Sequence, residues 1–173
     1  MSSKFSSLLA KQVQLLQPSQ KLMIYGAYGY TAELILDLIR KNDNSLLPHL
    51  VLAGRSKDKL QSVIKEMQWQ DLIKPNNVRS FSVDDSSKID EHIKDVQVVL
   101  NCAGPFSQTA YTMIQACVRN GVSYLDITGE WRICEYTLDS ENPETKQLQQ
   151  EADKKGISII PASGYDSVPS GTY

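Results

Sequence analysis

The chain has 173 residues and a mass of 19.4 kDa, with 41% hydrophobic and 22% charged residues. This composition fits one globular domain and excludes collagen-like, disordered and disulfide-scaffold chains. The formal net charge of −2 provides no electrostatic attraction to nucleic acid or to acidic lipid, so we expect no nucleic-acid partner.

The number and spacing of cysteine and histidine residues and the length of the apolar runs bear on the compartment, on metal binding and on membrane insertion. The three cysteines are odd in number and form no CxxC pair, and no secretory signal precedes them, which indicates a reducing, cytoplasmic compartment. His49 and His92 stand outside any metal-ligand spacing, so no metal site is expected. No apolar run approaches the roughly 20 residues that cross a bilayer, so no transmembrane segment is expected.

Residues 1–20 are predicted to be an N-terminal extension. Apolar residues from Phe5 to Leu16 form a loose helical stripe, and Lys4 and Lys11 are the only cations. The lack of arginine favours a packed or frayed helix over a targeting peptide. We assign the remaining residues, 21–173, to a single domain.

From residue 22 onward, short apolar runs alternate with longer amphipathic runs, a pattern typical of strands and crossover helices in a parallel sheet. The expected strands are 22–25, 50–53, 78–83, 96–101, 122–127 and 157–161. The expected helices are 31–40, 57–70, 89–93, 107–120 and 143–155, with Ser56 as an N-cap and with Gly121 and Gly156 as C-caps. The predicted fold is α/β, a doubly wound six-stranded parallel sheet with strand order 3-2-1-4-5-6.

In such a sheet, ligands bind beyond the carboxyl ends of the strands, where the first and fourth strands meet. The loop after the first strand has the pattern GxxGxxA and opens a helix. Its glycines would permit a close approach by a pyrophosphate, which the helix N-terminus attracts. The pattern alone also fits a structural turn, but its place on the first strand favours a nucleotide. The candidate cofactor residues here are Gly26, Ala27, Gly29, Tyr30 and Thr31.

The loop after the second strand indicates which dinucleotide is bound. Sites for NAD usually place a carboxylate here, whereas this chain has Arg55, Ser56 and Lys57. Arg55 can bind a 2′-phosphate with two parallel hydrogen bonds, and Ser56 can donate to it. Cations at a helix start oppose the helix dipole unless an anion binds there. The sequence therefore predicts NADP as the cofactor and NAD as the less favoured one.

Two further loops contribute candidates. Asp84 either accepts a hydrogen bond from the adenine amino group or simply ends a strand. The fourth strand leads into Asn101, Ala103 and Gly104, whose small size suits contact with the cofactor ribose and pyrophosphate, although an Asn-capped turn is the alternative.

No catalytic residue is assigned. Cys102 lacks a neighbouring base, so we do not expect a thiolate nucleophile. Asp126, Glu130 and Asp166 end strands on the ligand side, and either a substrate contact or a loop-bracing role fits them. No tyrosine has a lysine four residues later, which disfavours short-chain dehydrogenase chemistry.

Five ordered segments carry a resemblance: GAYGYTA, LAGRSKDKL, VVLNCAGPF, ACVRNGVSYLDITGE and SGYDSVP. Over residues 22–170 the chain resembles the N-terminal Rossmann domain of saccharopine dehydrogenase-like oxidoreductases, to which trans-acting enoyl reductases are related. The resemblance implies a nicotinamide cofactor held by Gly26, Gly29 and Arg55, and hydride transfer on an unknown small-molecule substrate. The chain departs from the family pattern at Ala32, where a third glycine is common.

The resemblance also implies a second domain, which shapes the substrate pocket and often a homodimer interface, and which we expect to be absent from these 173 residues. We therefore expect the chain to be inactive alone as an enzyme. The alternative is a non-catalytic Rossmann-fold protein that senses NADP or serves as a scaffold.

Overall fold

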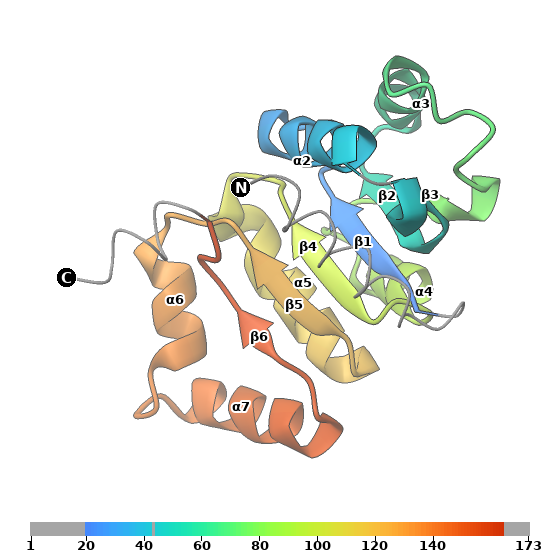
Figure 1. The fold of residues 1–173 in the computed structure, drawn as a ribbon. Coiled ribbons are helices and arrows are strands. Elements are labelled where there is room, and N and C mark those ends of the chain that lie inside the picture. Colours follow the sequence, from blue (N-terminus) through green and yellow to red (C-terminus); the bar gives the residue numbers. More distant parts are fainter. Residues whose placement is uncertain (1–19, 43, 165–173) are drawn as a thin grey trace.

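A six-stranded, all-parallel sheet forms the centre of the molecule (Figure 1). The computed structural model describes residues 20–42 and 44–164. The strand order β3-β2-β1-β4-β5-β6 confirms the predicted order. The strands are β1 (Leu22–Tyr25), β2 (Leu50–Gly54), β3 (Val78–Ser80), β4 (Val98–Asn101), β5 (Ser123–Asp126) and β6 (Ile159–Ile160).

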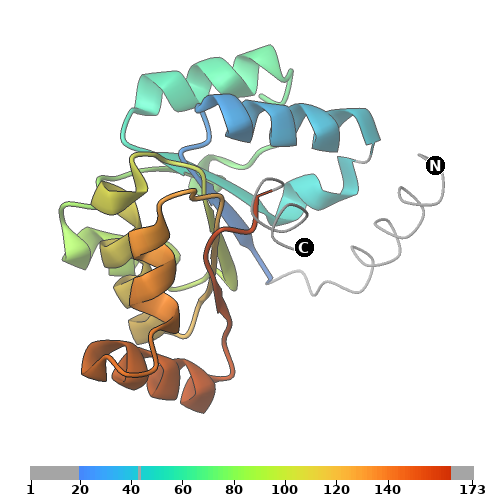
Figure 2. The same ribbon diagram turned by 90° about the vertical axis from the view of Figure 1, so that its left-hand side faces the viewer.

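Helices cover both faces of this sheet, as right-handed crossovers on either side of β1 and β4 require (Figures 1 and 2). One face carries α2 (Tyr30–Asn42) and α3 (Lys57–Glu66). The other carries α4 (Ser86–Ile93), α5 (Phe106–Asn120), α6 (Trp131–Leu138) and α7 (Pro143–Lys155). Two short 3-10 helices, η1 (Asn44–His49) and η2 (Pro75–Asn77), precede β2 and β3.

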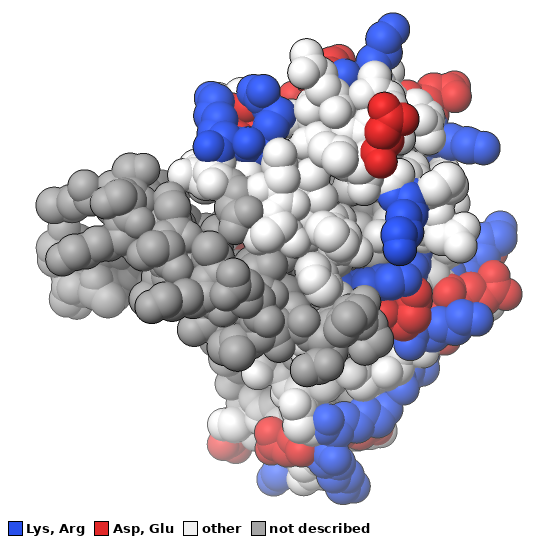
Figure 3. Space-filling view, turned by 45° about the vertical axis from the view of Figure 1, so that its right-hand side comes forward, with Lys and Arg blue, Asp and Glu red and all other residues white. Residues whose placement is uncertain are grey.

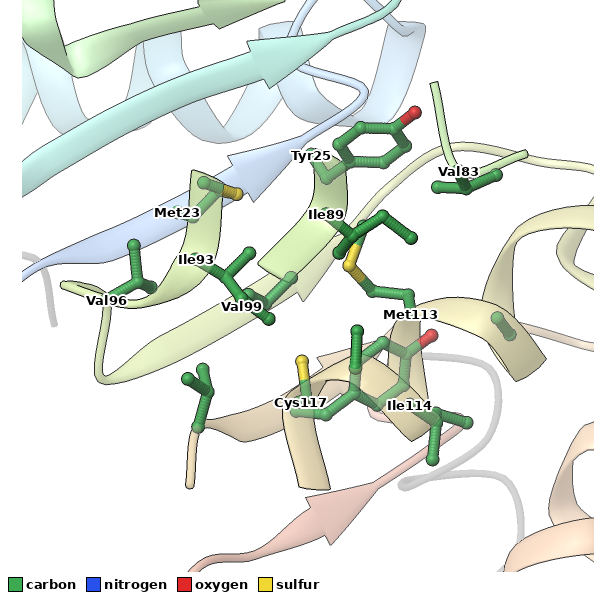
Figure 4. Packing of buried hydrophobic residues seen from close by; sticks show 14 of the residues in the cluster. Met23, Tyr25, Val83, Ile89, Ile93, Val96, Val99, Met113, Ile114 and Cys117 are labelled. Atoms are coloured by element: carbon green, nitrogen blue, oxygen red, sulfur yellow. The ribbon is translucent and has the colours of Figure 1, made fainter. Parts of the chain in front are cut away.

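The core has two layers because successive strand residues point to opposite faces of the sheet. Met23 and Tyr25 of β1 pack with α4 and α5, as Figure 4 shows, and Ile24 between them packs with α2 and α3. All three side chains are buried. A central parallel strand covered on both sides is expected to be apolar throughout, as β1 is.

The predicted caps are confirmed at three helix ends. The Ser56 hydroxyl accepts the N–H of Lys59 at 3.3 Å at the start of α3. Gly121 and Gly156 end α5 and α7 with φ of 70° and 63°, in the left-handed region that glycine adopts without strain.

Several predicted elements are longer than those observed. The third strand ends at Ser80 rather than residue 83, although Phe81 and Val83 remain buried beyond it. The second helix ends at Glu66 rather than residue 70, because Gln68 turns to φ 61° and Trp69 folds back into the core. In both places the apolar side chains stay buried although the backbone is no longer regular. The spacing of apolar residues alone therefore overestimated the lengths of β3 and α3.

The sequence did not predict α6. Its segment starts without a side-chain cap, and within it only Ile133 and Thr137 are buried. Aromatic and β-branched residues are also only moderate helix formers. Residues 1–19, with the predicted N-terminal helix, and Asp166 lie outside the described residues.

Candidate functional site

The loops after β1 and β4 touch at Gly26. Its φ is 80°, and a Cβ built there would lie 2.8 Å from the Cβ of Ala103. Its N–H donates to the Ala53 carbonyl of β2 at 2.8 Å. A side chain at this position would therefore be strained and would force the two loops apart.

The loop continues directly into α2. The N–H of Gly29 donates to Gly26 O at 2.8 Å, and the N–H of Glu33 donates to Gly29 O at 2.9 Å. The N–H groups of the first helical turn have no acceptor within a helix, so this turn, with the exposed Tyr30 and Thr31, can bind an anion. Ala27 of the loop and Ala32 of α2 are fully buried in the core on this side of the sheet, so neither side chain faces solvent.

A cleft of about 150 Å³ opens at the carboxyl ends of β1, β2 and β4. Five of the predicted cofactor residues line it together: Gly26, Gly29, Arg55, Ala103 and Gly104. A smaller hollow of about 50 Å³ is lined by Arg55, Ala103 and Gly104 again and also by Asp84. The structure thus brings the candidates from four separate loops to one edge of the sheet, the edge at which doubly wound folds bind nucleotides.

Tyr28, which the sequence analysis did not single out, also lines the cleft. Its hydroxyl accepts the N–H groups of Arg55 at 3.0 Å and Ser56 at 3.3 Å. The signal in the sequence is its size, since a large ring stands between two glycines in a loop where small residues permit close approach.

Tyr25 is a second lining residue that the sequence analysis missed. Its hydroxyl donates to the Phe81 carbonyl at 3.2 Å, and burial, with the nearby Tyr28, raises the pKa of Tyr25 to about 12. Asp84 also lines the smaller hollow, and its exposed carboxylate accepts from the Ser82 hydroxyl at 2.7 Å. That exposed carboxylate is available to a ligand, and it also braces its own turn.

Asn101 is fully buried and supports the loop from below. Its side-chain amide donates to the Tyr124 hydroxyl at 3.1 Å and to the Thr109 hydroxyl at 3.3 Å. Its side-chain oxygen accepts the N–H of Ala103 at 3.0 Å. These bonds hold Ala103 against Gly26, which favours a supporting role for Asn101.

Asp126 and Glu130, for which two roles remained open, both brace loops. Asp126 is fully buried and accepts from the N–H groups of Thr128 at 3.0 Å and Ala162 at 2.8 Å and from the Tyr124 hydroxyl at 2.8 Å. Glu130 accepts the first two N–H groups of α5, at 2.6 and 2.9 Å. Desolvation opposes these bonds, but the amides still lower the pKa of Glu130.

Nucleophilic and metal chemistry find little support among the described residues. Burial, with Asp126 nearby, raises the pKa of Cys102 to about 11, so its thiol stays protonated near neutral pH. No three His, Cys, Asp or Glu side chains of residues 20–42 and 44–164 converge as metal ligands.

Charges of both signs are mixed on the surface in view. On the part of the surface in Figure 3 that is not grey, Lys and Arg side chains lie beside Asp and Glu side chains, next to an uncharged area. Among the described residues of that face, mixed signs give no broad field that would attract a polyanion. In the part of the chain that the structure describes, no helix has the length and hydropathy of a bilayer span.

The comparisons with known proteins agree on one family. The model of the saccharopine dehydrogenase NADP binding domain matches residues 22–160. The chain is 33% identical over 159 residues to the saccharopine dehydrogenase-like oxidoreductase of Mus musculus, covering 86% of this chain and 35% of that protein. It is 30% identical over 153 residues to the trans-acting enoyl reductase of Mycobacterium leprae, covering 86% of this chain and 33% of that protein.

Among solved structures, apo saccharopine dehydrogenase (L-Glu forming) from Saccharomyces cerevisiae has the same fold, with a TM-score of 0.59 and 18% identity. That match covers 85% of this chain and 28% of the yeast chain. The chain thus spans about a third of the length of the curated relatives that it matches.

Proposed function

Because the chain belongs to the saccharopine dehydrogenase NADP binding domain family, we propose that it is the cofactor-binding part of an oxidoreductase that transfers hydride to or from a small molecule. The family binds NADP, and bound NADPH would supply the hydride. We assign residues 21–173 to this domain and residues 1–20 to an extension.

The residues around the cleft fit the parts of this cofactor. The first turn of α2, with Gly26, Gly29, Tyr30 and Thr31, would bind the pyrophosphate through backbone N–H groups. Ala103 and Gly104 would contact the ribose and pyrophosphate from the opposite side, and Asp84 would accept from the adenine amino group. Ala27 and Asn101 would hold the two loops in place from within the core.

One observation carries the choice of NADP: Arg55 stands at the end of β2, where it lines both the cleft and the adjoining hollow. No carboxylate of the chain occupies positions 53–57. The guanidinium can make two parallel hydrogen bonds to a 2′-phosphate, and the Ser56 N–H lies next to it at the start of α3.

Binding of NADPH and NADH to the wild-type chain and to Arg55→Ala tests this assignment. Loss of a hydrogen-bonded charge pair costs about 1.5–3 kcal/mol, so the dissociation constant for NADPH should rise about 10- to 150-fold. The constant for NADH should change by less than about threefold, because NADH has no 2′-phosphate. Calorimetry or the fluorescence of the bound dihydronicotinamide provides the measurement.

Arg40→Ala is the matched control, because Arg40 lies in the last turn of α2 and pairs with Asp37. It should bind both dinucleotides as the wild type does. Equal weakening of NADPH and NADH by Arg55→Ala would remove the 2′-phosphate assignment, and no binding of either by the wild type would remove the cofactor site itself.

The alternative function is a non-catalytic NADP sensor or scaffold. Its support is that Asp126, at the end of β5, and Glu130, which follows β5, already accept backbone N–H groups, and that burial disfavours the Cys102 thiolate. The length of the open reading frame in the transcript distinguishes the oxidoreductase from the sensor or scaffold. A reading frame that continues past the Tyr173 codon into a substrate domain supports the oxidoreductase, and a stop codon there supports the sensor.

We further propose a cytoplasmic location and, through a second domain, a homodimer. The support for the location is that Cys102, Cys117 and Cys134 are all free thiols, as a reducing compartment maintains them. A fluorescent fusion of the full-length protein tests the location, and its sedimentation tests the dimer. Secretion or a monomer would contradict the respective proposal.

A further inference from the structure

Tyr28 connects the loop after β1 with the end of β2. Its ring lies on Gly54, where an added Cβ would be 2.6 Å from the ring carbon Cε1. Its hydroxyl oxygen lies 3.0 Å from the Arg55 nitrogen and 3.3 Å from the Ser56 nitrogen, and it accepts both N–H groups. The residue is half-buried, so the ring forms part of the wall of the cleft.

The same two N–H groups are the backbone donors that a 2′-phosphate would use. Ser56 is the N-cap of α3, and its hydroxyl oxygen accepts the Lys59 N–H, which leaves the hydroxyl O–H as a further donor at this helix start. A phosphate held by the Arg55 guanidinium at this helix start would direct its oxygens at the amides of Arg55 and Ser56. One oxygen already occupies that position, and it belongs to Tyr28.

The surroundings of this hydroxyl are better suited to an anion than to a phenol. Arg55 and Lys57 flank the two amides, and the Lys59 ammonium lies 5.5 Å from the centre of the Tyr28 ring. Asp58 is the one acidic residue between positions 54 and 60. A phosphate would compensate these cations more fully than a hydroxyl does, because it carries formal negative charge.

From this geometry we propose that Tyr28 is a specificity-determining residue that occupies the 2′-phosphate subsite in the absence of cofactor. The phosphate must displace its hydroxyl from the Arg55 and Ser56 amides in order to bind. The inference rests on the proposed NADP site. It adds that binding of the 2′-phosphate is weakened by the need to displace the Tyr28 hydroxyl, whereas binding of a ligand without this phosphate is not.

The variant Tyr28→Phe tests this, because it removes the hydroxyl and keeps the ring on Gly54. The probes are 2′,5′-ADP and 5′-AMP, which share the adenosine half and differ at the 2′-phosphate. Two neutral hydrogen bonds no longer have to be broken, so 2′,5′-ADP should bind about 3- to 20-fold more tightly. Binding of 5′-AMP should stay within about twofold of the wild type. Calorimetry on the 173-residue chain measures both.

Tyr111→Phe is the matched control, since the Tyr111 hydroxyl donates to the Arg132 carbonyl on the α5 and α6 side, away from the cleft. It should leave both nucleotides unaffected. Tyr28→Ser provides a second variant in case Tyr28→Phe fails to fold, and it should also favour 2′,5′-ADP selectively. Thermal unfolding checks that each variant is folded.

Three results would overturn the inference. Weaker binding of 2′,5′-ADP by Tyr28→Phe would mean that the hydroxyl donates to the phosphate. Equal tightening of both probes would mean that the ring, not the hydroxyl, obstructs adenosine, and unchanged binding would mean that the subsite lies elsewhere. These outcomes differ from failure of the proposed function, in which wild type and variants alike bind neither probe.

Discussion

At Gly26 the loops after β1 and β4, which line the cleft, are in contact. The positive φ of Gly26 and its contact with Ala103 each require glycine, and the contact exists because β1 and β4 are neighbours in the sheet. This requirement holds whether or not a nucleotide is bound. The glycine therefore has a structural function, because the missing side chain lets the loops after β1 and β4 touch.

Gly26→Ala should lower the free energy of unfolding by about 2–4 kcal/mol, the sum of a left-handed backbone penalty and overpacking against Ala103. Urea unfolding followed by circular dichroism measures the change. Gly129→Ala is the control, because an added Cβ there meets nothing within 4 Å, and it should cost less than about 1 kcal/mol. A loss at Gly129 as large as that at Gly26 would contradict this account.

At the residue scale, the sequence was sufficient to predict candidate site residues whose charge or conformational freedom differs from that of their neighbours in the sequence. Gly26, Gly29 and Arg55 stand out through conformational freedom or charge at a strand end, and they do line one cleft. The roles of Tyr28, Asp126 and Glu130 could not be predicted, because each depends on a backbone amide more than 20 residues away in the sequence. Such contacts follow from the fold and not from local spacing.

At the scale of elements, Asp95 links three strands at the edge of the sheet opposite the cleft. Its carboxylate pairs with Arg79 of β3 at 2.6 and 2.9 Å and with Lys21, which precedes β1, at 2.6 Å. Asp95 itself lies just before β4. The Arg79 bonds, with Lys21 adding to them, hold the pKa of Asp95 well below its ordinary value.

Asp95→Asn should therefore destabilise the fold in a pH-dependent way. A carboxylate with a lowered pKa in the folded state stabilises the fold above its unfolded pKa of about 4 and loses that effect as the pH falls further. We expect a loss of about 1 kcal/mol near neutral pH, because the Asp95 side chain is 45% exposed. The difference from the wild type should shrink toward about pH 2.

Urea unfolding of both proteins across this pH range measures the effect. Asp71→Asn is the control, an exposed aspartate in the turn after α3, and it should differ little from the wild type at any pH. A difference between Asp95→Asn and the wild type that stays constant or grows on acidification would refute the assignment.

The sequence predicted elements best where a cap and an apolar stripe coincide. Helix α7 begins at Pro143 and ends at Gly156 as expected, because proline suits a first turn and glycine suits a left-handed cap. Helix α6 has no such signals, since the Glu130 carboxylate before it caps α5 instead. The strand pattern beyond Ser80 was misleading because Phe81 and Val83 stay buried in irregular backbone.

At the scale of the whole molecule, the strand order fixes where a ligand can bind. With β1 and β4 adjacent and their crossovers on opposite faces, the loops after these strands diverge and leave a cleft between them. The alternation of apolar and amphipathic runs was sufficient to predict this order. The substrate of the protein could not be predicted, because the chain spans only about a third of the length of its curated relatives.

NADP is proposed to bind at this cleft with its 2′-phosphate at the start of α3. Amide NMR spectra of the 173-residue chain, recorded with NADP+ and with NAD+, test it most directly. We predict that NADP+ shifts the amides of Gly26, Gly29 and Gly104 and also those of Arg55 and Ser56, with the last two far less affected by NAD+. Shifts confined to the shallow hollow between α5 and α7, around Arg119 and Glu151, would contradict the account.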